Sequence, residues 1–197
     1  MVVMKKAYLN RKGYNIKEKY LTKEQIKLIE KDLIVSPKTM SYNEISYNMY
    51  RKKRGRYILP RFWAEKHIGK AVKEKFKHQK SEMKFNPKVK LYRFQQHVMG
   101  KSLPRIKKEG GGLISVVCGG GKTVMSLYIA CQLKVKTLVI VHTTDLEDQW
   151  KERIEFFTDA KVGIIRGKKC DIEDKDIVIA SIQSISKKDY GNKFGQF

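Results

Sequence analysis

The chain has 197 residues, of which 41% are apolar and 32% are charged, and its net charge is +23. This length suits one domain, or one domain with an appendage, that buries roughly 70% of the surface of its unfolded chain. No apolar run approaches the ~18 residues of a membrane span, and the first residues lack the apolar stretch of a secretory signal. We therefore expect a protein that is neither secreted nor membrane-spanning.

The charge is unevenly distributed. Residues 1–110 hold 30 basic and 9 acidic side chains, a net charge of +21, whereas residues 111–197 hold 13 and 11, a net charge of +2. The first half therefore predicts a polyanion-binding surface and the second half an ordinary enzyme domain. Nucleic acid is the expected polyanion. A genome-wide preference for lysine is the alternative explanation for part of the excess. A membrane surface is disfavoured because no basic helix shows an apolar opposite face.

The three cysteines, Cys118, Cys131 and Cys170, are far apart in the sequence and match no metal-binding spacing. We therefore expect neither a disulfide nor a zinc site. This cysteine usage fits a protein of a reducing compartment such as the cytoplasm.

The first half predicts a mixture of helices and strands. Thr22 and Gln25 form a capping box, and a helix with apolar residues at helical spacing then extends toward Pro37. Residues 45–61 predict a hairpin with Gly55 at its turn. The highly charged stretch that follows predicts a helix from Phe62 to Lys77.

The second half alternates strands and helices. A helix is expected over residues 91–99, and a buried strand, a glycine loop and a helix over residues 112–130. Further strands are expected at Thr137–His142, Lys161–Arg166 and Asp176–Ala180, with a helix opened by a capping box of Thr144 and Glu147. Because the strands are continuous Val/Ile/Leu runs, they predict an α/β domain whose parallel sheet is covered by helices on both faces.

Residues 118–124 predict a phosphate-binding loop. Gly119, Gly120 and Gly121 can adopt backbone angles that turn successive N–H groups toward an anion, and the following helix adds unpaired N–H groups. Lys122 can reach the β- and γ-phosphates, and the Thr123 hydroxyl can bind Mg²⁺. Val116 stands where the strict motif has glycine. The alternative is a glycine-rich turn before a helix, which the Gly-Lys-Thr sequence between two apolar segments disfavours.

Segments on both sides of the loop resemble motifs of superfamily 2 helicases. Leu-Tyr-Arg-Phe-Gln95 resembles the Leu-Arg-x-Tyr-Gln segment of that family, with Tyr92 in place of the common Arg. A glutamine amide matches the N6 and N7 edge of adenine, so the resemblance implies that Gln95 reads the base. The alternative is that Gln95 is an ordinary surface residue of the helix and does not contact a nucleotide.

The segment from Leu138 to Ile154 is similar to motif Ia of the same superfamily, in which a strand–helix junction binds nucleic-acid phosphates. Thr143 and Thr144 are the candidates here, while Leu146 and Trp150 are expected in the core. Residues 176–184 resemble the family's Ala-Thr-x-x-Ser segment, which implies that Ser181 and Gln183 contact the backbone of the bound nucleic-acid strand. Helix capping by Ser181 is the alternative.

These matches lie in the family's order across residues 91–184. The chain is therefore similar to the first RecA-like domain of a superfamily 2 DExH-type helicase, most like those of large DNA viruses. The resemblance implies a RecA-like domain over residues 86–197 and a basic α+β extension over residues 1–85, in which Tyr57–Arg61 matches a segment of the viral proteins. The nucleotide site would comprise Gln95 and Cys118–Val124 (Cys118, Gly119, Gly120, Gly121, Lys122, Thr123, Val124), with ATP and Mg²⁺ as cofactors.

In that family the next element is a strand ending in Asp-Glu-x-His, and the sequence stops near the expected start of this strand. The sequence also lacks the family's second RecA-like domain, which supplies an arginine finger. Such a finger typically raises the hydrolysis rate ~10³- to 10⁵-fold. We therefore expect the parent protein to be an ATP-dependent helicase or translocase, and this chain to bind nucleotide and nucleic acid while hardly hydrolysing ATP. The rival is a non-catalytic nucleic-acid-binding module from a split or truncated gene. A small-molecule kinase is disfavoured by the basic first half.

One basic cluster lies outside the RecA-like region, at the expected hairpin tip. It consists of Arg51, Lys52, Lys53, Arg54 and Arg56. The cluster predicts phosphate contacts, with Tyr50 and Tyr57 stacking on unpaired bases. The alternatives are a solvated turn and a nuclear-localisation patch, so we expect the cytoplasm or a viral replication site, with the nucleus as the alternative.

Overall fold

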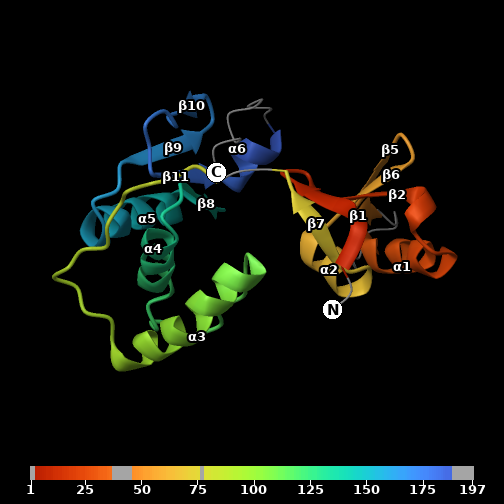
Figure 1. Cartoon of the computed structure of the whole chain (residues 1–197). Coiled ribbons are helices and arrows are strands. Elements are labelled where there is room, and N and C mark those ends of the chain that lie inside the picture. Colours follow the sequence, from red (N-terminus) through yellow and green to blue (C-terminus); the bar gives the residue numbers. More distant parts are fainter. Residues whose placement is uncertain (1–2, 37–45, 76–77, 188–197) are drawn as a thin grey trace. The chain divides into compact units, whose positions relative to one another are not determined.

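The computed structural model describes residues 3–36, 46–75 and 78–187 (Figure 1). The chain divides into two compact units, Met1–Lys77 and His78–Phe197. Each unit has its own sheet and its own buried cluster.

Unit 1 is built on a five-stranded sheet in the order β5-β6-β2-β1-β7. Its strands are β1 (Val3–Asn10), β2 (Gly13–Lys17), β5 (Arg51–Lys53), β6 (Arg56–Leu59) and β7 (Lys70–Glu74). The β1–β7 pair is parallel and the other pairs are antiparallel. A short 3₁₀ helix (Glu18–Tyr20), helices α1 (Lys23–Leu33) and α2 (Arg61–His67), and a small sheet of β3 (Ile34–Val35) and β4 (Tyr47–Asn48) complete the unit.

The core of unit 1 lies between one face of the sheet and its two helices. Tyr14 and Ile16 of β2 face this core, where Ile29 of α1 and Ala64 of α2 are also buried. Asn15 between them is buried on the other face, where its side-chain amide donates to Asn10 Oδ1 and Gly13 O. Such alternation between the two faces is the pattern of a β-strand. The capping box at Thr22 is confirmed, because the Thr22 hydroxyl accepts from Gln25 N–H and the Gln25 side chain accepts from Thr22 N–H.

Two predictions for unit 1 are wrong. The first arm of the expected hairpin, Tyr47–Asn48, pairs with Ile34–Val35 instead, and the hairpin consists of β5 and β6 alone; Ile45 lies outside the described residues. The charged stretch forms the short helix α2 and then strand β7, rather than one helix to Lys77. The helix ends because Gly69, at φ 126°, adopts a conformation that only glycine readily takes, and β1 then pairs with the following residues.

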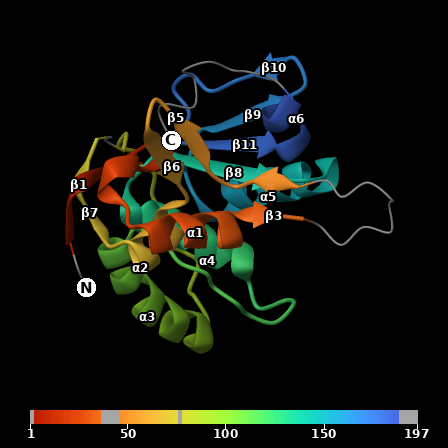
Figure 2. The ribbon, with the colours of Figure 1, turned by 90° about the vertical axis from the view of Figure 1, so that its right-hand side faces the viewer.

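Unit 2 contains a four-stranded sheet in the order β10-β9-β11-β8. Its strands are β8 (Thr137–Val141), β9 (Val162–Arg166), β10 (Lys169–Cys170) and β11 (Ile177–Ser181), and its helices are α3 (Arg93–Glu109), α4 (Lys122–Leu133), α5 (Thr144–Phe157) and α6 (Ile182–Lys187). Strands β9, β11 and β8 run parallel, side by side (Figure 2), as predicted.

Helices cover both faces of this sheet. On one face, Leu127 of α4 and Ile154 of α5 pack with Ile177 and Ile179 of β11. On the other, Ile185 of α6 packs with Val178 and Ala180. Every residue of β11 is therefore buried, and the predicted α/β class, a parallel sheet covered by helices on both faces, is confirmed.

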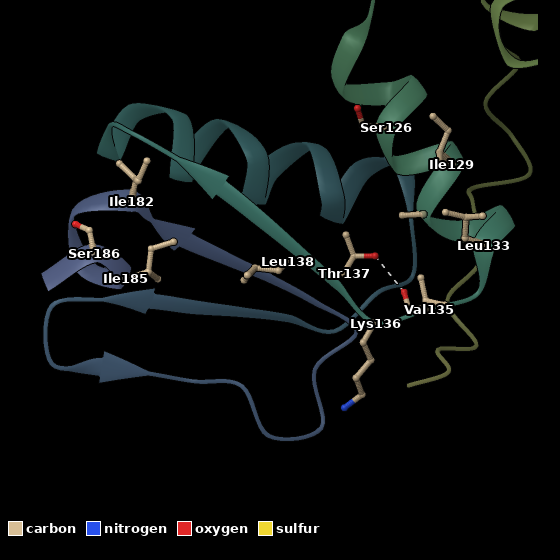
Figure 3. A pocket seen from close by; sticks show the side chains of 11 residues that line it. Ser126, Ile129, Leu133, Val135, Lys136, Thr137, Leu138, Ile182, Ile185 and Ser186 are labelled. Carbon is tan, nitrogen blue, oxygen red and sulfur yellow. Dashed lines mark hydrogen bonds between the residues drawn. The ribbon is translucent and has the colours of Figure 1, made fainter. Parts of the chain in front are cut away.

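The strand predicted before the glycine loop does not form. Residues 111–117 have no regular secondary structure, and Leu113 is 96% and Val117 76% exposed. A strand needs a hydrogen-bonded neighbour, and in the described part of the chain the sheet ends at β8, where Ile140 is also 52% exposed. Beside this edge lies an open groove of about 860 Å³, lined by residues of α4, β8 and α6 such as Ile129, Leu138 and Ile182 (Figure 3).

The helix predicted over residues 91–99 is longer than expected. It starts after Tyr92 and continues to Glu109 through Pro104. Gly110, at φ 75°, ends it in the left-handed conformation typical of a helix C-terminus. None of the helices in the described ranges is long and apolar enough to cross a bilayer.

Burial of one hydroxyl gives a test of the unit 1 fold. Burial raises the pKa of Tyr14 to about 12, and its hydroxyl donates to Gly69 O at 2.9 Å. Tyr14→Phe leaves this carbonyl without its partner, so we expect a loss of about 1–2 kcal/mol in the free energy of unfolding, measured by urea denaturation. Tyr47→Phe is the matched control, because Tyr47 is 54% exposed; equal stability of the two variants would contradict the assignment.

Candidate nucleotide and nucleic-acid site

The glycine loop turns at two residues in the left-handed conformation. Gly119 has φ 75° and Gly121 has φ 77°, and Gly120 N–H donates to Val117 O at 3.1 Å between them. Gly121 is the N-cap of α4 and supplies no capping side chain, and Met125 N–H donates back to Gly121 O at 3.0 Å. The N–H groups of the first helical turn, residues 122–124, therefore have no side-chain cap and suit an anion.

Gln95 holds this loop against the start of α3. Its side chain is 4% exposed; Oε1 accepts from Tyr92 N–H at 2.9 Å, and Nε2 donates to Gly120 O at 3.3 Å. A Cβ atom on Gly121 would overlap the Gln95 amide nitrogen. The surface position weighed for Gln95 is thus wrong, and its reading of adenine stays a prediction.

Lys122 and Thr123 follow the loop on the first turn of α4. The Lys122 ammonium donates to Val116 O at 3.3 Å and to Val117 O at 3.2 Å, so it lies on the loop that leads into the helix. Thr123 is half-buried and Cys118 is exposed. Val124 is buried with Met99 of α3, which fixes α4 to α3 behind the loop.

The residues at the loop limit how a Mg²⁺ ion could be held there. Among the described residues, no group of three or more His, Cys, Asp or Glu side chains is arranged to hold a metal ion. The binding of Mg²⁺ by Thr123 stays a prediction; there the hydroxyl would share the ion with phosphate oxygens and water, a ligand set that Mg²⁺ accepts.

A second polar group forms at the carboxyl ends of β8, β9 and β11. Gln183 Nε2 donates to His142 O at 2.8 Å, and Gly167 N–H donates to Ser184 Oγ at 2.9 Å. Ser181 Oγ lies 3.2 Å from both Gln183 Oε1 and Ser184 Oγ. These bonds link the ends of the three parallel strands. Ser184 N–H also donates to Ser181 Oγ at 3.2 Å, so the capping of α6 by Ser181 that was the alternative is observed, and the contact of Ser181 and Gln183 with nucleic acid stays a prediction.

The threonines predicted to bind phosphate lie at the start of α5. Thr143, not Thr144, is the N-cap: its hydroxyl accepts from Leu146 N–H at 3.4 Å, and Thr144 is the first helical residue and exposed. The predicted capping box of Thr144 and Glu147 is therefore wrong. Leu146 and Trp150 contribute to the core cluster, as expected.

Glu147 has a role that the sequence did not reveal. Its side chain is 1% exposed, and Oε2 accepts from Arg166 Nη1 of β9 at 3.2 Å, while Oε1 has no partner. The capping-box spacing concealed this pair, and no local signal links residues 147 and 166. The buried carboxylate holds the half-exposed Arg166 guanidinium at the same end of the sheet.

The basic cluster of unit 1 extends from strand β5 through its turn to the start of β6. Arg51, Lys52 and Lys53 form β5, the turn is Arg54 and Gly55 with φ 50° and 65°, and Arg56 begins β6. Lys52 pairs with Glu18. The base-stacking role expected of Tyr57 is wrong, since Tyr57 is 2% exposed, whereas Tyr50 is only partly buried and its stacking stays a prediction.

A family model described as "Type III restriction enzyme, res subunit" matches residues 66–196. The chain belongs to this family. Its resemblance to the first RecA-like domain of superfamily 2 helicases is confirmed, and so is its likeness to proteins of large DNA viruses.

Three relatives illustrate this. A putative ATP-dependent RNA helicase of Acanthamoeba polyphaga mimivirus is 32% identical over 200 residues, which cover 95% of this chain and 38% of the relative. A DNA 3'-5' translocase of Sulfurisphaera tokodaii is 38% identical over 87 residues, 44% of this chain and 20% of the relative. A putative helicase of Invertebrate iridescent virus 6 is 35% identical over 95 residues, 48% of this chain and 19% of the relative. The chain thus spans less than two fifths of the length of these relatives.

The loop geometry predicts that Gly121 tolerates no side chain. Gly121→Ala places a Cβ on the Gln95 amide and strains a left-handed residue, so we expect ATP affinity to fall at least about tenfold. Gly100→Ala is the control, because a Cβ at this helical position meets nothing within 4 Å. Titration of a fluorescent ATP analogue checks both variants, and undiminished binding by Gly121→Ala would contradict the site.

Proposed function

We propose that this chain binds ATP and Mg²⁺ through Cys118–Val124 and binds nucleic acid, as the N-terminal part of an ATP-dependent helicase or translocase. The observation that carries the proposal is the glycine loop, which buried Gln95 holds in front of the uncapped N-terminus of α4. Membership of a family with helicase relatives supports it.

In the proposed complex, the phosphates lie against the first turn of α4. The N–H groups there and the positive end of the helix dipole favour negative charge. Lys122, now on the Val116 and Val117 carbonyls, moves to the phosphates, and Thr123 binds Mg²⁺. The ion, when bound, would neutralise charge on the phosphate oxygens.

Gln95 retains enough hydrogen-bonding capacity to bind adenine as well. An amide side chain has two N–H donors and two acceptor lone pairs. Tyr92 N–H and Gly120 O occupy one acceptor position and one donor. The remaining donor and acceptor match adenine N7 and the N6 amino group.

We propose that a nucleic-acid strand contacts the carboxyl ends of the parallel strands of unit 2. Thr143 and Thr144 supply hydroxyl and backbone N–H groups at the start of α5, and Ser181 and Gln183 lie at the end of β11. Such contacts to phosphates position a strand without reading its sequence.

We propose that hydrolysis needs polypeptide beyond this chain, which the longer relatives possess. A strand paired with β8 would cover the exposed Ile140 and give residues 112–117 a neighbour, and its end would supply the Asp and Glu of the family motif. A second RecA-like domain would supply an arginine finger. The exposed apolar residues Leu113 and Ile140 favour this reading over a non-catalytic module, because a finished sheet would bury them.

Removal of one ammonium group tests the nucleotide site. We expect Lys122→Ala to abolish measurable binding of an ATP analogue, because the variant loses the charge that follows the loop. Lys151→Ala, which removes an exposed lysine of α5, should bind as the unaltered chain does. Tight ATP binding by Lys122→Ala would overturn the assignment.

Strand-stimulated ATPase tests the need for further polypeptide. We expect this chain to hydrolyse ATP at least ~10³-fold more slowly than a version extended by about two hundred residues of its own reading frame, in line with the contribution of an arginine finger. Equal rates for the two proteins would refute the proposed division of the site.

A further inference from the structure

The five-stranded sheet of unit 1 has a second face that neither α1 nor α2 covers. Tyr14, Ile16, Tyr57 and Leu59 point into the core with these helices. Strand alternation therefore places the residues between them, such as Lys17 and Arg56, on the opposite face. We call this surface the open face.

Strand register extends the open face across the whole sheet. Lys17 and Lys53 both pair with Arg56, Arg51 pairs with Ile58, and Tyr8 pairs with Lys73, so each pair shares one face. Lys75 follows two residues after Lys73. The cations of the open face are Lys17, Arg51, Lys53, Arg56, Lys73 and Lys75.

The carboxylates of unit 1 lie elsewhere, as far as the structure describes them. Glu18 pairs with Lys52, and Glu74 pairs with Arg61 of α2 on the core side of the sheet. The others described, Glu24, Glu30, Asp32 and Glu65, belong to α1 and α2. The open face therefore carries positive charge that no described carboxylate of unit 1 offsets.

Tyr8 gathers two of these cations at the middle of the sheet. The Arg56 guanidinium carbon lies 5.2 Å and the Lys75 ammonium 4.0 Å from the centre of the Tyr8 ring. Arg56 comes from β6 and Lys75 follows β7, so the two reach the ring from opposite sides of β1. Two like charges held at one ring are suited to an anionic group, because its binding relieves their repulsion.

The chemistry beside the open face favours a nucleic acid among polyanions. A hollow of about 510 Å³ adjoins Arg51 and Ile58, and Arg11, Lys12, Met49 and Tyr50 also line it. Cations next to apolar and aromatic side chains suit phosphates linked to flat bases. Five strands at ~4.8 Å spacing span ~19 Å, enough for about three to six nucleotides.

We infer that the open face binds the phosphodiester backbone of a single-stranded nucleic acid, with Arg56 and Lys75, held by Tyr8, as the central phosphate contacts. The inference rests on the proposed nucleic-acid binding and names the surface in unit 1 that carries it. Tyr8 is a positioning residue: it holds the two cations.

The test uses the whole chain and a fluorescein-labelled oligothymidylate of 20 nucleotides. The double variant Arg56→Gln, Lys75→Gln should reduce the slope of log affinity against log salt by about 1.4, since each contact to a single-stranded phosphate contributes ~0.7. The control Lys23→Gln, Lys27→Gln removes the same charge from exposed positions on α1, which packs on the other face, and should keep the slope of the unaltered chain.

Tyr8→Leu separates positioning from net charge, because it changes no charge. We expect it to weaken binding roughly three- to tenfold. An unchanged slope in the Arg56, Lys75 variant, or an equal loss in the α1 control, would overturn the inference. ATP-analogue binding is measured in parallel and should be the same in all variants. If the unaltered chain does not bind the oligonucleotide at all, the proposed nucleic-acid binding fails with the inference; loss of ATP binding alone leaves it standing.

Discussion

The site depends on the contact between Gln95 and the backbone of the glycine loop. One buried amide group caps the start of α3 through Tyr92 N–H and holds Gly120 O, which lies 25 residues away in the sequence. Gly121 must remain glycine because its backbone is left-handed and lies against that amide. The segment before the loop and the loop itself are therefore one structural element. Hydrogen bonds within the chain hold its shape, and such preorganisation favours binding.

The features that the sequence predicted correctly rest on local rules. The capping box at Thr22 needs two side chains three residues apart, and helix α4 follows from its glycine N-cap and apolar residues. Strands β8, β9 and β11 were found within one residue at either end because continuous Val/Ile/Leu runs suit strands buried on both faces. The polar residues at and after the ends of these strands, Ser181 among them, lie close together because parallel strands end at one edge of the sheet.

The features that the sequence did not predict depend on partners far along the chain. Residues 112–117 have strand-like composition, but no described strand pairs with them, and composition alone does not make a ladder. Glu147 fits a capping box by spacing, yet β9 supplies Arg166 and makes it a buried ion pair. Tyr57 looks available for stacking until alternation on β6 turns it into the core, while Arg56 beside it faces outward. Knowledge of sheet order was needed in each case.

In the proposed function the two units have separate roles: the glycine loop of unit 2 binds the triphosphate, and the open face of unit 1 binds the nucleic acid. The most direct measurement for the central claim is hydrogen–deuterium exchange of the peptide covering residues 118–124, with and without a slowly hydrolysed ATP analogue and Mg²⁺. If the N–H groups there bind the phosphates, their exchange slows when nucleotide is added. A second peptide that contains the exposed Leu113 serves as the reference and should exchange as before. Unchanged exchange across residues 118–124 at saturating nucleotide would show that the loop binds no triphosphate.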